Sequence, residues 1–444
     1  MKWCNAFFVF GLALATALPV SRLPAQAPAQ KLQTQKQRAT RIGTTPENLK
    51  IAKDWDKEGK DEQKEFERMR KGDSLVTEEN KAILDQAAIW YAYRLTQDIY
   101  QDTANTSKTM HELVKQAFGQ ILDRTDPRKQ LTQAQQTFKD EFEKRFIARL
   151  SEVTCNRRDI ARLNAAMILA RIAATNQEDA VDVLLEIIQD PGENDGVRLY
   201  AFRGIKEFLL IGRANDSSAF TNKDREARCV RVLLDYLARR PEKLSGGKRE
   251  LAALSYVRRE AVAALGLTRL PAASTTEKKV TTIQRMTAFG LLRVMRKDGI
   301  VPEPSIAEQV EAAIGVCQLR SKLCDEYQVD YAADQIGRFL VEFLSSYNGE
   351  KDKEVKTEPW KIHAARLIQA LDELKTDTER SNFKVYMAKF VSQAQSPLND
   401  ILGGKNTPNP TELGTWLDNN KPTSTSLFKD RPDIVIKETE KAEQ

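Results

Sequence analysis

The sequence holds few of the residue types on which hydrolytic and metal-dependent enzymes rely. It has two histidines, His111 and His363. A helical zinc-protease motif needs a second histidine four positions after the first, and Lys115 stands there instead. Zinc sites use closely spaced cysteine and histidine ligands, whereas the cysteines after the N-terminal one lie mostly far apart (Cys155, Cys229, Cys317 and Cys324). We predict no metal site and no cofactor.

Other catalytic patterns are incomplete. Ser245-Gly246-Gly247-Lys248 looks like part of a phosphate-binding loop, but the earlier glycine is missing and Arg249 takes the place of Ser or Thr. The chain has no Gly-x-Ser-x-Gly nucleophile elbow. Charged residues make up 30% of the chain, so adjacent carboxylates carry no signal. We predict no catalytic residue and no enzymatic activity.

The remaining chemical feature is a basic segment. Between residues 225 and 300 the chain has 17 Lys and Arg against 7 Asp and Glu. Arginine side chains suit carboxylates and other anions, which indicates an acidic protein partner. The alternative is a solvated helix surface whose arginine stems cover apolar rows. The candidate partner-binding residues are Arg228, Arg231, Arg239, Arg240, Arg249, Arg258 and Arg259. The whole chain carries only +6, which does not indicate a nucleic-acid partner.

The N-terminus has the pattern of an export signal. Lys2 precedes a mostly apolar run over residues 6–20, and Ala25-Gln26-Ala27 supplies small residues for a signal peptidase. The run is shorter than the roughly 20 residues that span a bilayer, although an uncleaved anchor is the alternative. After signal removal we expect no transmembrane span and a location in the periplasm, the cell envelope or the medium.

The elements that carry these residues are predicted to be helices. From about residue 157 onward, apolar residues recur at three- and four-residue steps in segments of 12–18 residues, with prolines between segments or at helix starts. Thr45-Pro46-Glu47 predicts the start of an earlier, polar helix over residues 46–70. No alternating strand pattern of useful length precedes the C-terminal tail. The pattern is typical of an all-α protein.

One short phrase recurs along these helices. Val197-Arg198 and Ala201 are matched downstream by Val257-Arg258 and Ala261, and a weaker copy lies upstream. An internal repeat predicts stacked units that bury their apolar faces against each other. The repeat positions are Arg162, Ala165, Val197, Arg198, Ala201, Val257, Arg258 and Ala261.

This phrase, with Asp195-Gly196 before the first copy, resembles the HEAT repeat. The resemblance implies an α-solenoid of stacked antiparallel helix pairs in an exported, bacterial-type protein. It also implies that the small alanines allow close helix packing, and that Arg162, Arg198 and Arg258 pair with acidic groups and are structural. The match covers residues 159–300 well and 300–400 loosely, and it is absent from residues 46–150.

These observations predict five regions: a signal peptide (1–27), a flexible leader (28–45), an N-terminal helical region (46–150), a HEAT-like α-solenoid (151–402) and a low-order tail (403–444). Cys317 and Cys324 are seven residues apart, so a disulfide between them requires the helix to break near Arg320. Buried free thiols are the expected state.

A stack of helix pairs offers a long surface for a macromolecular partner. We therefore predict an exported, non-catalytic scaffold that binds a protein. A structural component of the cell envelope and a helical-toroid hydrolase acting on glycans are the alternatives. The sequence leaves the oligomeric state and the identity of the partner open.

Overall fold

The computed structural model describes residues 39–52, 54–100, 106–121, 131–214, 218–239, 248–275, 282–350, 358–379, 381–404 and 407–435. The described residues belong to one compact unit, Ala39–Gln444. The predicted signal peptide and most of the predicted leader lie outside the described residues.

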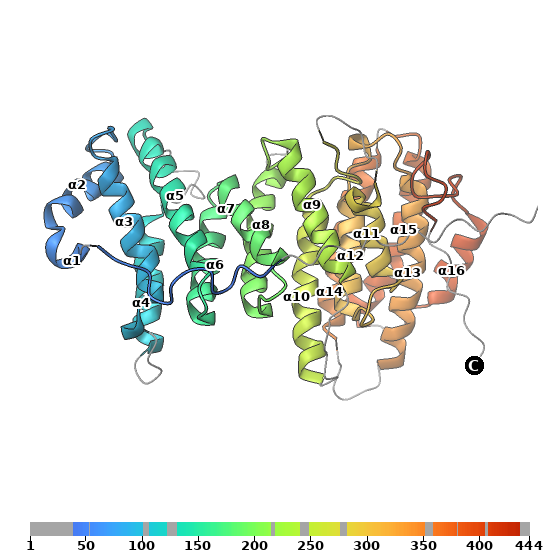
Figure 1. Ribbon diagram of the computed structural model, residues 1–444. Coiled ribbons are helices and arrows are strands. Elements are labelled where there is room, and N and C mark those ends of the chain that lie inside the picture. The colour runs from blue at the N-terminus through green and yellow to red at the C-terminus, as the bar shows by residue number, and fades with distance from the viewer. Residues whose placement is uncertain are drawn as a thin grey trace, which may run out of the picture. The chain divides into compact units, whose positions relative to one another are not determined.

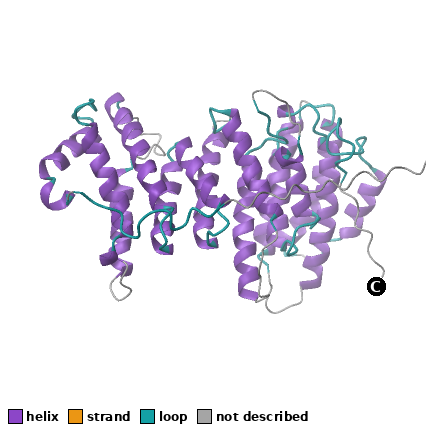
Figure 2. Cartoon of the chain, in the orientation of Figure 1, coloured by secondary structure: helices purple, strands orange, loops and turns teal. Residues whose placement is uncertain are grey.

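The described residues fold almost entirely into helices and connecting loops (Figure 2). Within these ranges no strand occurs, and an isolated bridge joins Tyr327 to Phe428. The prediction of an all-α protein is confirmed.

The N-terminal helices pack around phenylalanines. The helices are α1 (Trp55–Glu58), α2 (Lys60–Lys71), α3 (Lys81–Tyr93), α4 (Thr106–Gln120) and α5 (Gln133–Val153). Phe66 of α2 meets Phe138 and Phe142 of α5 edge to face, with ring centroids 5.2 Å apart in both pairs. Such pairs stabilise a core beyond the area that they bury.

The helix predicted to begin at Pro46 does not form there, since the first helix begins at Trp55. Residues 41–47 instead run as a strap along the end of α5 and the loop after it (Figure 1). The amide of Gly43 donates to the carbonyl of Cys155 at 2.7 Å, and the Asn156 amide donates to the carbonyl of Pro46 at 2.9 Å. These partners satisfy backbone groups that a helix would have paired internally.

From residue 159 the helices pack in two rows. The first row contains α6 (Asp159–Ala173), α8 (Asp195–Ala214), α10 (Lys248–Leu267), α12 (Ile306–Gln318) and α14 (Trp360–Thr378), each in contact with the next. The second row contains α7 (Glu178–Gln189), α9 (Lys223–Ala238), α11 (Thr287–Met295) and α13 (Val329–Glu350). Consecutive helices alternate between the rows, an arrangement compatible with an α-solenoid (Figure 1).

The three copies of the repeated phrase lie on α6, α8 and α10, which are successive helices of the first row. Ala165, Ala201 and Ala261 are completely buried. Small side chains at these places let neighbouring helices approach closely. Val197 and Val257 are buried as well.

The repeated arginines make structural contacts. Arg162 is buried, and its Nε donates to both carboxylate oxygens of Glu193 at 3.1 Å. Arg162 and Arg198 also pair with the aspartates three residues before them, Asp159 and Asp195. Arg162 also donates to the carbonyls of Asn156 and Arg157, and Arg198 donates to the carbonyl of Asp190, which ties each helix to the chain that precedes it.

Part of the segment expected to be a low-order tail is helical. The last helices are α15 (Lys384–Leu402) and α16 (Pro410–Asn419), and α16 packs against α13. Beyond it, Phe428 and Ile434 are buried, and the amide of Gln328 donates to the carbonyl of Leu427 at 2.9 Å. Only a few apolar residues pack this segment against the rest of the protein. Its sequence therefore lacks the regular three- and four-residue spacing of apolar residues that predicts a helix.

The cysteines of the described residues are buried free thiols: Cys155, Cys229, Cys317 and Cys324. The helix does end before Arg320, because α12 stops at Gln318. No disulfide forms there between the two neighbouring cysteines. Burial raises the pKa of the Cys229 and Cys317 thiols, which keeps both in the neutral form.

Candidate functional site

Among the arginines predicted to bind a partner, those whose side chains the structure describes lie on both rows of helices and do not form one surface. Arg228 and Arg231 lie on α9, in the second row, and Arg239 caps its C-terminal end. Arg228 pairs with Asp182 at 2.9 Å, and Arg239 donates to the carbonyl of Gln189 at 3.2 Å. Burial, followed by the nearby Arg198 charge, lowers the pKa of Arg239. Arg240 and the side chain of Arg249 lie outside the described residues.

Two of the predicted arginines are neighbours on α10 with different surroundings. Arg258 is buried, and its Nε donates to Glu308 at the start of α12 at 2.5 Å. Arg258 therefore exposes little surface to a partner, and this pairing agrees with its predicted structural role. The guanidinium of Arg259 lies 4.9 Å from the centre of the Tyr256 ring and lines a cavity.

That cavity, which we call the groove, has a volume of about 440 Å³ and lies on the first row of helices. Helices α8, α10, α12 and α14 each contribute one face to it. On α12 the lining residues Glu311, Ile314, Gly315 and Gln318 recur at three- and four-residue steps, the spacing of one helix face. The apolar lining consists of Leu210, Ala263, Leu267, Ile314 and Ile362.

A close contact between two glycines supports the groove. A Cβ atom on Gly266 of α10 would lie 2.6 Å from the Cα of Gly315 of α12. Real Cβ atoms do not approach other atoms so closely, so position 266 needs glycine at this helix spacing, while a Cβ at Gly315 would make a tight contact at 3.0 Å. Gly315 itself lines the groove. The close approach of α10 and α12 beside the groove therefore depends on the lack of a side chain at Gly266.

Ion pairs between helices border the groove. Lys206 of α8 donates to Glu260 of α10 at 2.5 Å. Arg366 of α14 donates to both carboxylate oxygens of Glu311 of α12, at 2.7 Å each. This paired contact raises the pKa of Arg366. Bidentate contacts fix the orientation of both side chains, which gives the groove charged edges at set positions.

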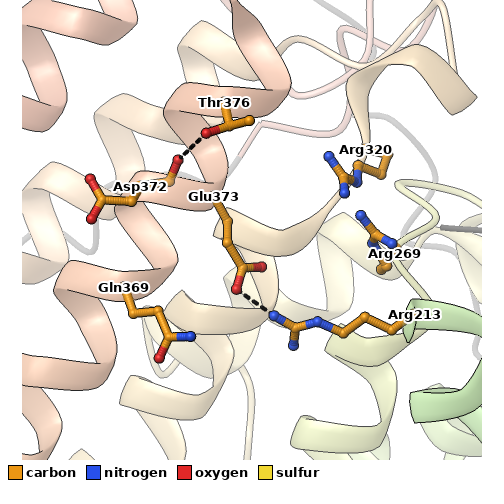
Figure 3. A pocket seen from close by; sticks show the side chains of 7 residues that line it. All are labelled: Arg213, Arg269, Arg320, Gln369, Asp372, Glu373 and Thr376. Carbon is orange, nitrogen blue, oxygen red and sulfur yellow. Dashed lines mark hydrogen bonds and ion pairs between the residues drawn. The ribbon is translucent and has the colours of Figure 1, made fainter. Parts of the chain in front are cut away.

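A second cavity, which we call the arginine cavity, has a volume of about 420 Å³ and adjoins the groove through Arg213, which lines both. Its lining residues are Arg213, Arg269, Arg320, Gln369, Asp372, Glu373 and Thr376. Figure 3 shows the three guanidinium groups facing α14, where Glu373 accepts a hydrogen bond from Arg213. The cavity thus combines three cationic groups with two carboxylates.

The loops that carry two of these arginines are tied to each other and to α14. The amide of Arg320 donates to the carbonyl of Arg269 at 2.9 Å. The Arg320 guanidinium donates to Asp377 at 3.0 Å, and the amide and hydroxyl of Ser321 donate to the other oxygen of the same carboxylate. Asp377 is almost completely buried. This network fixes where the Arg320 side chain lies.

The arrangement offers anion recognition and ion pairing. Within the described residues, no group of three or more His, Cys, Asp and Glu side chains is placed to hold a metal ion. His363 lines the groove but is buried, with its Nε2 3.2 Å from Glu358. Burial, and then the Glu373 charge, raises the pKa of Cys317, which disfavours a thiolate nucleophile there.

The sequence analysis did not identify Arg213, Arg269, Arg320 or Arg366. One available signal was a polar face on α14, where Arg366, Gln369, Glu373 and Thr376 recur at helical spacing. The other three arginines come from a helix and two loops and share no motif.

Comparisons with protein-family models, curated proteins and solved structures find no match to this chain. None of the helices in the described ranges is both long enough and apolar enough to cross a bilayer.

Proposed function

We propose that this protein is an exported, non-catalytic scaffold that binds an extended segment of a partner protein in the groove. In this proposal the helix rows form a HEAT-like α-solenoid, and its first row presents the binding surface. The observation that carries the proposal is the groove itself, a concave site of about 440 Å³ between four helices. Cavities of this volume accommodate small ligands or a few side chains.

Exposed aliphatic side chains in the groove favour a polypeptide ligand. Leu210 is 37% exposed and Ile362 is 61% exposed, and both line the groove. Burying such side chains against a partner is favourable, at about 25 cal/mol per Å² of apolar surface. The charged pairs at the edges, such as Arg366 with Glu311, supply specificity for backbone and polar groups.

Site-directed photo-crosslinking tests the groove. A benzoylphenylalanine in place of Ile362 should crosslink to a discrete partner in the cells that produce the protein. The matched control is Val385 on α15, which is 67% exposed and lies outside the lining of the groove. Equal crosslinking from both positions, or none from position 362, would contradict the proposal.

Export is tested separately. Mass spectrometry of the mature chain should find an N-terminus directly after Ala27, in protein recovered from the envelope or the medium. Intact Met1 in that material would contradict cleavage of the signal.

A further inference from the structure

The arginine cavity gathers three cationic groups from separate elements of the fold. Arg213 comes from α8, Arg269 from the loop after α10 and Arg320 from the loop after α12, and all three side chains face the same space (Figure 3). Like charges repel, and a charged group loses hydration when it is partly buried. Glu373 and Asp377 offset part of this cost for Arg213 and Arg320, and a ligand anion beside them would add to that compensation.

Two of the three guanidinium groups are held in position before any ligand arrives. Asp377 holds Arg320 from behind the cavity, at 3.0 Å. Arg269 is only 9% exposed, and its backbone adopts the left-handed conformation, with φ of 58°. Glycine is the usual residue at such a position after a helix. Arginine is more strained than glycine in this backbone conformation. Its presence at position 269 therefore favours a role for its side chain.

The cavity already contains the interaction that a ligand would make. Arg213 pairs with the carboxylate of Glu373, and these side chains are 29% and 33% exposed. A second carboxylate placed beside this pair would meet Arg269 and Arg320. Guanidinium groups bind carboxylates through paired, parallel hydrogen bonds.

We propose that the arginine cavity binds a carboxylate of the polypeptide segment that occupies the groove. This inference rests on the proposed function, because the segment reaches the cavity by passing Arg213, the residue that both cavities share. The carboxylate comes from an acidic side chain or from the C-terminus of the partner. The partner is therefore an acidic or C-terminally anchored peptide.

The substitution Arg269→Gly gives a sharp test. It removes one guanidinium and leaves a residue suited to the left-handed backbone, which offsets part of the loss of a buried side chain. Lys297→Gly is the matched control. Lys297 also has a left-handed backbone, with φ of 61°, follows α11 in the second row, and pairs with Glu303 outside both cavities. A thermal melt of each variant establishes that it is folded before the binding preferences are compared.

Peptides are selected from two random heptapeptide libraries, one displayed with free C-termini and one displayed internally. Peptides enriched on the unaltered protein should carry aliphatic residues. They should also carry an acidic residue, or they should be enriched only from the library with free C-termini. The Arg269→Gly protein should lose the acidic or C-terminal preference, and the Lys297→Gly protein should keep it. Arg213→Gln should weaken the same preference.

Synthetic versions of an enriched peptide then identify the source of the carboxylate by isothermal titration calorimetry. If the C-terminus supplies it, amidation weakens binding about tenfold or more; if a side chain supplies it, Glu→Gln does so. Enriched peptides with no carboxylate preference, or a preference that survives Arg269→Gly, would overturn the inference and leave the groove intact. Failure to enrich any peptide would overturn the groove as well.

Discussion

Arg213 on α8 forms an ion pair with Glu373 on α14, 160 residues further along the chain. The two helices are separated in the first row by α10 and α12. A pair between the first and last of four successive helices requires that stretch of the row to curve. This curvature places Arg213 where the groove and the arginine cavity meet.

Charge reversal tests this pair. Arg213→Glu and Glu373→Arg should each lower the free energy of unfolding by about 1 kcal/mol or less, because both side chains are partly exposed. The double variant should recover most of the loss, with a coupling energy of roughly 0.5–1 kcal/mol. Urea denaturation of the four proteins measures the cycle. A coupling energy near zero would show that the pair does not hold α8 against α14.

The buried repeat arginine should behave differently. Arg162→Met leaves Glu193 without its guanidinium partner, and the Glu193 side chain is 1% exposed. We expect a loss of about 3–5 kcal/mol in the free energy of unfolding. Arg145→Met is the control, since Arg145 is 23% exposed and pairs within its own helix, and it should change stability by less than about 1 kcal/mol. Similar losses for both variants would argue against a structural role for the repeated arginine.

The glycine contact beneath the groove predicts a steric effect. Gly266→Ala places a Cβ atom against the Cα of Gly315, so α10 and α12 must separate. Overpacking of this kind lowers the free energy of unfolding by about 1–3 kcal/mol. Gly349→Ala in α13 has open space around the new Cβ and should stabilise the chain by up to about 1 kcal/mol. Thermal unfolding of both variants measures the difference, and an unchanged melting temperature for Gly266→Ala would contradict the close contact.

A buried carboxyl in the N-terminal helices predicts a pH dependence. Burial raises the pKa of Glu143 from 4.5 to about 6, although Lys139 lies 2.8 Å away. The folded protein therefore binds a proton between pH 6 and 4.5 that the unfolded chain does not bind. The stabilising contribution of Glu143 to the free energy of unfolding is therefore fully present below pH 4.5 and is lost as the pH rises through 6.

Comparison with Glu143→Gln isolates the effect. The stability of the unaltered protein relative to this variant should increase by up to about 2 kcal/mol as the pH falls from 7 to 4.5. Urea denaturation at several pH values measures it. A difference that is constant with pH would show that Glu143 titrates alike in the folded and unfolded chains.

Apolar spacing predicted most helices from residue 157 onward, because an i, i+3, i+4 pattern is local information. The repeated phrase also predicted equivalent places for Ala165, Ala201 and Ala261, which lie on successive helices of one row. The predicted helix start at Pro46 was wrong, because the side-chain amide of the distant Asn156 takes up the carbonyls of Pro46 and Glu47. Helix α16 was missed because too few apolar residues mark it.

The site was beyond the reach of the sequence. The number of Lys and Arg residues between 225 and 300 does not reveal which helix face each arginine occupies. The prediction therefore placed Arg228 of the second row in one patch with Arg259 of the groove. The sequence alone determined that the chain is helical and that its repeated units pack through small residues, since spacing along a helix sets both. Only the tertiary structure decided which polar faces meet, because the curvature of a row and the rotation of each helix depend on contacts between residues far apart in the chain.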